Sequence, residues 1–230
     1  MTTSRAGLRR AALTAAALVA AAAVLLGVML GLGWLVTHVL PGTGLAVDDL
    51  GLDRWLADHR VPVLDPDSQA ATDLCATNNV IAIGLAVAVT STAFASAWWP
   101  AAFVVVTLAG ETALFLTTAI VVGRPRPPVA HLDAALPPTS SFPSGHTAAA
   151  TCLFGGIAVL VCRATRSWWR WVVVAAAVLL VVAVAASRLY RGAHYPTDVL
   201  GGAFLGCCWL AVTARALVPR HSAVREPAPA

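Results

Sequence analysis

The chain has 230 residues, of which 59% are hydrophobic and only 11% are charged. A soluble domain needs more charge to cover its surface, so this composition excludes a soluble globular protein and predicts a membrane protein with several spans. The formal net charge of +4 comes from arginines without a single lysine, and we interpret it by position relative to the membrane, not as a nucleic-acid-binding surface.

The amino terminus carries Arg5, Arg9 and Arg10, and an apolar run follows from Ala12 to about Leu40. A charged start before apolar residues can be a signal peptide, but this run exceeds the ~7–15 residues of a signal h-region. We therefore predict a cytoplasmic segment over residues 1–11 and an uncleaved first span. Paired arginines alone are weak support for twin-arginine export.

Residues 41–68 form the first polar segment. Within it, apolar side chains share one stripe and charged side chains surround them, namely Leu50, Leu52, Trp55 and Leu56 among Asp49, Asp53, Arg54 and Asp58. This pattern predicts a short amphipathic helix that lies at the membrane interface.

Five further apolar runs are long enough to cross a bilayer, which takes roughly 20 residues. They cover about 72–94, 101–122, 143–162, 171–188 and 196–217. The predicted fold is all-α, an integral membrane bundle of six transmembrane helices over residues 12–218, followed by a disordered cytoplasmic tail over 219–230. The third span contains Glu111, for which structural pairing and a functional role both stay open.

Small residues in the spans indicate packing. The cysteines lie in or beside apolar runs without metal-site spacing, at Cys75, Cys152, Cys162, Cys207 and Cys208. We interpret them as packing residues. Gly201, Gly202 and Gly206 in the last span are typical of close helix contacts.

Three polar clusters stand at the ends of spans. They are Gly123-Arg124-Pro125-Arg126-Pro127, then Phe142-Pro143-Ser144-Gly145-His146, and the segment from Ser187 to Asp198. With six spans, the ends of the third and fifth and the starts of the fourth and sixth lie on one side. All three clusters therefore share one leaflet, where such residues are rarely placed without a use.

The arginines also predict the orientation. The side with both termini and the 163–170 turn holds nine arginines, and the other side holds six, four of them in the clusters. Because excess positive charge marks the cytoplasm, we expect a multi-pass protein of the cell membrane with cytoplasmic termini and an extracytoplasmic active site.

The clusters predict a phosphate site. The second and third each place a proline at the first turn of a helix, where free N–H groups and the positive dipole end favour an anion. Arg126 and Arg188, together with Arg124, supply fork-shaped donors that match phosphate oxygens. Gly145 allows the backbone to approach the anion closely.

A phosphate held in this way needs a nucleophile and a proton donor, and His194 and His146 can divide these roles. Asp198, four residues after His194, can accept one ring N–H and leave the other nitrogen free to attack phosphorus. His146 can protonate the leaving oxygen. The first step then yields a phosphohistidine, the second hydrolyses it, and no metal or cofactor is required.

These segments resemble the three motifs of the type 2 phosphatidic acid phosphatase family, whose members are also similar to vanadium haloperoxidases. The second motif is matched by the Pro-Ser-Gly-His of residues 143–146, and the third by Ser187, Arg188, His194 and Asp198. Of the first motif, which is lysine, six residues and Arg-Pro, only the Arg-Pro at 126–127 is present, because Ala119 stands at the lysine position.

The resemblance covers about residues 20–217 and implies a role for each matched residue. It implies that phosphate is bound by Arg126, Ser144, Gly145 and Arg188, with His146 as acid and His194 as nucleophile backed by Asp198. Ala119 removes one cationic contact, worth roughly 1.5–3 kcal/mol in context. Arg124 lies beside the site and is a candidate substitute.

Two functions from different classes remain open. One is an outward-facing lipid phosphate phosphatase acting on phosphatidic acid, phosphatidylglycerol phosphate, or polyprenyl phosphates or diphosphates that enter sideways from the leaflet. The other is a lipid phosphate transporter or binding protein, which keeps the arginines but does not need the His194–Asp198 pair. A vanadate-dependent haloperoxidase is disfavoured, because that chemistry is best known in soluble relatives.

Overall fold

The computed structural model describes residues 5–133, 136 and 140–219. Within these ranges the chain is all-helical, as predicted. The α-helices are α1 (Arg5–Trp34), α2 (Gly44–Asp58), α3 (Asp65–Asp73), α4 (Thr77–Ala95), α5 (Trp99–Val122), α6 (Gly145–Ala164), α7 (Trp169–Tyr190) and α8 (Pro196–Leu217). Apart from Pro219, the predicted disordered tail lies outside the described residues.

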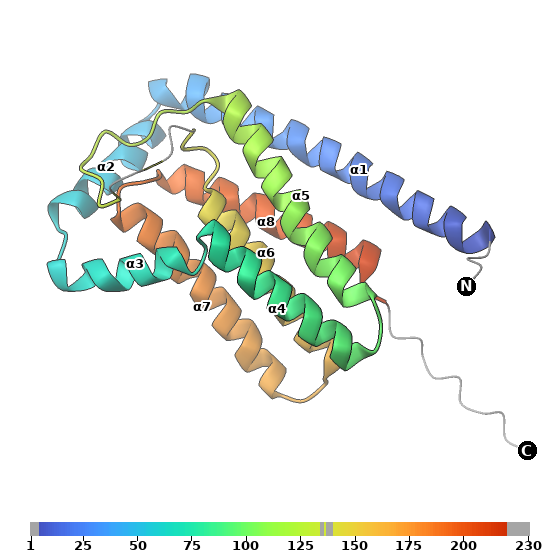
Figure 1. Cartoon of the computed structure of the whole chain (residues 1–230). Helices are drawn as coiled ribbons and strands as arrows, with labels where there is room; N and C mark the ends of the chain where they lie inside the picture. Colours follow the sequence, from blue (N-terminus) through green and yellow to red (C-terminus); the bar gives the residue numbers. More distant parts are fainter. Residues whose placement is uncertain (1–4, 134–135, 137–139, 220–230) are drawn as a thin grey trace, which may run out of the picture.

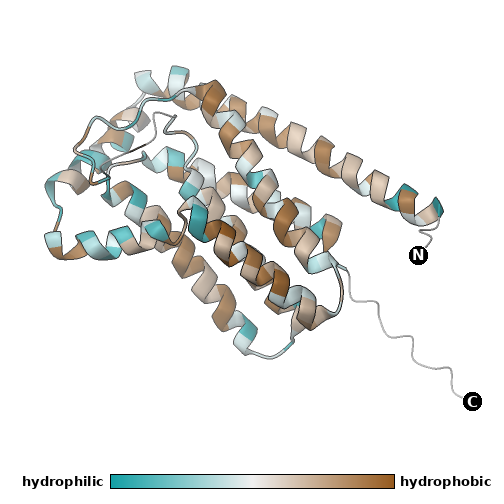
Figure 2. Cartoon of the chain, viewed as in Figure 1, coloured by the Kyte–Doolittle hydropathy of each residue, from teal (hydrophilic) through white to brown (hydrophobic). Residues whose placement is uncertain are grey.

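Six of these helices are long and apolar enough to span a membrane, which confirms the predicted number of spans (Figure 2). The first span continues beyond α1 through a π-helical turn at Leu35–Val39 and a 3-10 turn at Leu40–Gly42. The second begins at Thr77 and not near residue 72, because residues 65–73 form the separate helix α3, which has proline in its first turn.

Helices α2 and α3 lie together at one end of the bundle, opposite the start of α1 and the end of α8 (Figure 1). The predicted helix α2 is present, and two of its acidic side chains turn inward while two of its apolar side chains are exposed. Asp49 and Asp53 are 5% and 0% exposed, whereas Leu52 and Trp55 are 42% and 56% exposed. Asp49 turns inward onto the buried Arg124, whereas neither carboxylate oxygen of Asp53 has a hydrogen-bond partner among the described residues.

Close contact between α6 and α8 fixes the start of α6 against the start of α8. An added Cβ at Gly202 would come within 2.3 Å of the Ser144 carbonyl oxygen, and one at Gly206 within 2.6 Å of Thr151. These glycines therefore let the two helix backbones approach, as the sequence predicted. The same interface carries the second and third polar clusters.

Glu111 on α5 faces the bundle and is 2% exposed. Its Oε2 accepts a 3.4 Å hydrogen bond from Thr112, and its Oε1 has no partner among the described residues. Of the two open interpretations, structural pairing with a basic group is therefore not observed in this part of the chain.

Candidate active site

The three polar clusters meet at the α2–α3 end of the bundle. Four hydrogen bonds to backbone carbonyl oxygens connect them. Ser141 N–H donates to Arg124 at 2.8 Å, and Ser144 N–H donates to Asp198 at 2.9 Å. His194 Nδ1 donates to Ser141, and Arg126 Nη1 donates to Ala193, both at 2.7 Å. Segments that lie up to 74 residues apart in the chain, as Arg124 and Asp198 do, thus form one site.

Two arginines present unused donors there. Arg126 donates Nη1–H to a backbone carbonyl, and Arg188 donates Nη1–H to Thr72 Oγ1 at 3.2 Å. The Nε atoms of both are buried and have no acceptor among the described residues. Burial, and then the like charge of Arg188, lower the pKa of Arg126. Buried, unsatisfied N–H groups on two neighbouring cations are costly, and an anion between them would remove that cost.

His194 is 4% exposed and has a defined tautomer. Its Nδ1 lies 2.7 Å from the Ser141 carbonyl oxygen, and because a carbonyl can only accept, Nδ1 must carry the proton. In the neutral ring Nε2 then holds the free lone pair. Burial lowers the pKa of His194, and the nearby Asp198 carboxylate opposes this only in part.

The predicted hydrogen bond between His194 and Asp198 is not made. Asp198 Oδ2 lies 3.8 Å from His194 Nδ1, which is within ion-pair range but too long for a hydrogen bond. That oxygen instead accepts the Tyr195 N–H at 2.9 Å, and Oδ1 accepts from Arg124 Nη1. Ser141 therefore sets the tautomer, and Asp198 acts on the ring as a nearby charge.

The donors of Arg124 are taken up by two carboxylates, which counts against its predicted roles as a phosphate ligand and as substitute for the lysine. Its Nη1 donates to Asp198 and to Thr197 Oγ1 (2.7 Å), and its Nη2 to Asp49 Oδ2 (2.9 Å). The guanidinium also lies 4.0 Å from the centre of the Tyr195 ring. Burial alone would lower the pKa of Arg124, but Asp198 and Asp49 outweigh it and raise the pKa.

The Pro-Ser-Gly-His segment begins α6, as predicted. Ser144 is fully buried at its N-cap, and its Oγ accepts a 3.0 Å hydrogen bond from Thr147. An added Cβ at Gly145 would meet the Phe115 ring at 2.7 Å, so packing against α5 also requires this glycine. His146 lies in the first turn of α6 and is partly exposed, and the charges of Arg188 and His194 act on it.

Sequence reasoning missed Asp133, which lies between the first two clusters. Its Oδ2 is 2.9 Å from Arg188 Nη1, and its Oδ1 accepts from Arg191 Nε. The loop is fixed at that point because Leu132 N–H donates to the Arg191 carbonyl oxygen at 3.1 Å. The available signal was that Asp133 is the one acidic residue between Gly123 and Phe142.

Helix α3, which the sequence did not predict, supports the same arginines. Thr72 hydrogen-bonds to Arg188, and Ser68 Oγ accepts from Arg191 Nη1 at 3.1 Å. Ala119, at the lysine position of the first motif, is 1% exposed on α5.

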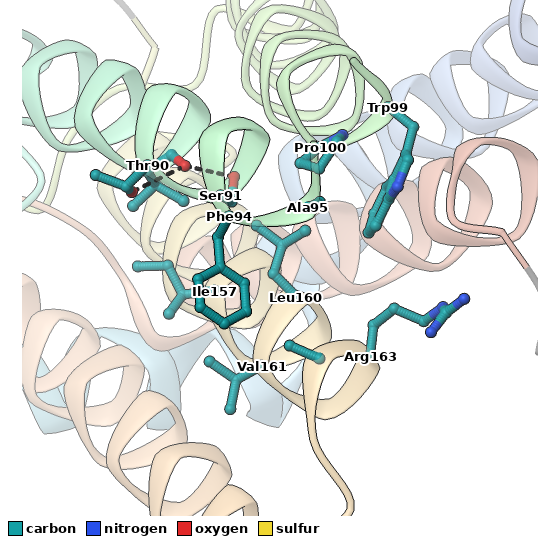
Figure 3. A pocket seen from close by; sticks show the side chains of 12 residues that line it. Thr90, Ser91, Phe94, Ala95, Trp99, Pro100, Ile157, Leu160, Val161 and Arg163 are labelled. Carbon is teal, nitrogen blue, oxygen red and sulfur yellow. Dashed lines mark hydrogen bonds between the residues drawn. The ribbon is translucent and has the colours of Figure 1, made fainter. Parts of the chain in front are cut away.

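Two cavities lie outside this cluster. One, of about 620 Å³, opens between α4, α5 and α6 at the opposite end of the bundle, where Phe94, Trp99, Leu160 and Arg163 line it (Figure 3). The other, of about 580 Å³, lies between the end of the first span, α2 and the start of α8, and Asp49 contributes to its wall. Neither is lined by the two histidines.

Comparison with known proteins finds a family, a named protein and a solved structure that resemble this chain. The PAP2 superfamily matches residues 82–222. A stretch of 68 residues is 41% identical to phosphatidylglycerophosphatase B of Bacillus subtilis (strain 168), and covers 29% of this chain and 34% of that protein. The crystal structure of a transmembrane PAP2 type phosphatidylglycerolphosphate phosphatase from Bacillus subtilis superimposes with a TM-score of 0.72 at 21% identity, over 87% of this chain and 98% of that one.

Proposed function

The chain belongs to the PAP2 superfamily, and from that premise we propose that it is an integral membrane lipid phosphate phosphatase that works through a phosphohistidine. One observation carries the proposal. His194 holds its proton on Nδ1 and its lone pair on Nε2, beside two arginines whose buried Nε–H groups lack acceptors in the described residues. A nucleophile and an anion-binding pair thus stand together, which binding alone does not require.

In the first step Nε2 of His194 attacks phosphorus, the P–Nε2 bond forms, and the bond from phosphorus to the lipid oxygen breaks. The leaving oxygen takes a proton from His146. Arg126 and Arg188 stabilise the charge on the equatorial oxygens. In the second step water attacks the phosphohistidine, His146 accepts the water's proton, and the P–Nε2 bond breaks to release inorganic phosphate.

The proposed substrate is a lipid phosphomonoester or diphosphate. Phosphatidylglycerol phosphate comes first in the panel, because both Bacillus proteins named above carry that activity in their names. Phosphatidic acid and polyprenyl diphosphate follow. The excess of arginine at the opposite end of the bundle supports cytoplasmic termini and an extracytoplasmic site.

In the test, purified protein in detergent is given each lipid phosphate in turn. The release of inorganic phosphate is measured with and without a chelator. We expect release that the chelator does not reduce. His194→Ala should abolish release while vanadate binding and thermal stability persist, and His194→Gln controls for lost volume. Release from no lipid phosphate would favour the transporter alternative, and normal turnover in His194→Ala would remove the nucleophile.

The pH profile offers a second test. Attack needs the neutral His194 ring, and burial lowers the pKa of His194 from its ordinary 6.5. As the pH falls, kcat/KM should therefore decrease with the protonation of His194, and the midpoint of that decrease should lie below pH 6.5. A midpoint above that value would contradict the assignment of His194 as the unprotonated nucleophile.

A further inference from the structure

Asp49 on α2 belongs to none of the three motifs, yet it contacts the residues behind the nucleophile. We propose that Asp49 is a positioning residue that acts through Arg124 on Asp198, and so sets the charge that His194 experiences during catalysis. The inference rests on the proposed function for its kinetic consequence, but not for its electrostatic one.

The contacts form a closed ring. Asp49 Oδ2 accepts from Arg124 Nη2 at 2.9 Å and from Thr197 Oγ1 at 2.6 Å, and Asp49 Oδ1 accepts the Thr197 N–H at 3.0 Å. Thr197 Oγ1 in turn accepts from Arg124 Nη1, which also donates to Asp198. Asp49 thereby satisfies a free N–H in the first turn of α8 and holds the guanidinium against Asp198.

Burial makes this ring strong. Asp49 is 5%, Arg124 9% and Asp198 0% exposed. Screening by water is weak at such positions, and one cation, Arg124, is shared between the Asp49 and Asp198 carboxylates, so these three groups together carry a net negative charge. The neighbouring Asp53 has its pKa raised to about 8 by burial and then by these carboxylates, so it adds no full charge at neutral pH. That charge favours the positive charge that develops on His194 as its Nε2 bonds to phosphorus.

The remaining charged groups around His194 have the opposite effect. Beyond burial, the charges of Arg188 on α7 and Arg126 before α6 lower the pKa of His194. Other titratable groups close to these arginines are His146 on α6 and Asp133, which pairs with Arg188. Asp198 is the carboxylate that opposes them. If Asp49 is neutralised, Arg124 pairs with Asp198 alone, and the local balance at His194 becomes more positive.

A purely mechanical role for Asp49 predicts something else. Loss of an α2 anchor would lower the folded fraction, or raise KM and lower kcat together. Loss of the shared charge should lower kcat with little change in KM, because Asp49 does not contact the phosphate site, and should move the titration of His194 to lower pH.

The experiment compares Asp49→Asn with Asp48→Asn, which removes the same charge from the exposed neighbouring position on α2. Asp49→Glu, which restores the charge, is the rescue. Steady-state kinetics use the best lipid phosphate of the panel. Independently of turnover, the imidazole of His194 is titrated by NMR in detergent with ring-labelled histidine, and its signal is assigned with His194→Gln.

For Asp49→Asn we expect kcat to fall about tenfold or more with KM within about threefold. The His194 midpoint should move down by at least about half a pH unit. Asp48→Asn should leave both unchanged, and Asp49→Glu should recover most of both. An unmoved His194 midpoint in folded Asp49→Asn overturns the inference. If wild type hydrolyses no lipid phosphate, the proposed function fails, and the titration alone still decides the inference.

Discussion

Asp133 offers the sharpest test of how the arginines of the proposed phosphate site are held in position. It bridges Arg188 and Arg191, with Oδ2 2.9 Å from Arg188 Nη1. Its side chain is 15% exposed and that of Arg188 3% exposed, so little water competes for the pair. Burial would raise the pKa of Asp133, but Arg188 and Arg191 outweigh it and lower the pKa. The two arginines thus favour the charged form of the Asp133 carboxylate.

The perturbation is Asp133→Asn, which keeps the shape and removes the charge. Arg188 then retains Thr72 at 3.2 Å as its hydrogen-bond partner among the described residues and loses its fixed position. Loss of a hydrogen bond between charged groups costs about 1.5–3 kcal/mol. At 1.4 kcal/mol for each factor of ten, kcat/KM should fall about 10-fold to 100-fold, mainly through KM.

The assay is the initial rate of phosphate release against lipid phosphate in mixed micelles, together with the inhibition constant of vanadate. Asp67→Asn, at an exposed position of α3, is the matched control for charge. A different role for Asp133 makes the opposite prediction. If its carboxylate competes with the substrate for Arg188, Asp133→Asn should lower KM and tighten vanadate binding, and that result would refute the positioning argument.

Three further predictions follow from other parts of the site. Burial, and then neighbouring carboxylates, raise the pKa of Asp53 from 3.8 to about 8, so its contribution to stability is full below pH 3.8 and is lost as pH rises through about 8. The thermal midpoint of Asp53→Asn minus that of wild type should therefore increase between pH 5 and pH 8.5. A difference that stays constant over this range would contradict the prediction. Gly202→Ala should lower both stability and turnover, since its Cβ would lie 2.3 Å from a carbonyl oxygen of the Pro-Ser-Gly-His segment, whereas Gly31→Ala has open space and should be neutral. Ala119→Lys should lower KM up to about tenfold, because Arg124 is occupied elsewhere and cannot replace the missing lysine; unchanged kinetics would restore Arg124 as the substitute.

The sequence predicted most of what depends on local pattern and membrane thickness. Apolar runs near 20 residues long fix the number of spans, since each must satisfy its backbone inside lipid. The number of spans then fixes which helix ends share a side, so the convergence of the three clusters could be predicted from parity alone. The glycines at 202 and 206 were identified by the same reasoning about helix packing.

Side-chain partners could not be predicted in this way. Asp198 lies four residues from His194, which suggested a direct hydrogen bond between the two side chains. In the structure, its two oxygens instead accept hydrogen bonds from the buried Arg124 and from the Tyr195 N–H, which are better placed donors. The burial of Asp49 on α2 also depends on tertiary structure, because the packed helices bring Arg124 within 2.9 Å of its carboxylate.

Sequence by itself therefore determined the fold class, the meeting of the three clusters at one end of the bundle, and the residue types available for chemistry. Tertiary structure alone decided which donor each carboxylate binds: Asp49 and Asp198 share Arg124, and Asp133 holds Arg188. The reason is physical. Periodicity and length act along one helix at a time, whereas a buried charge is paired by whichever opposite charge the packed helices bring within about 4 Å.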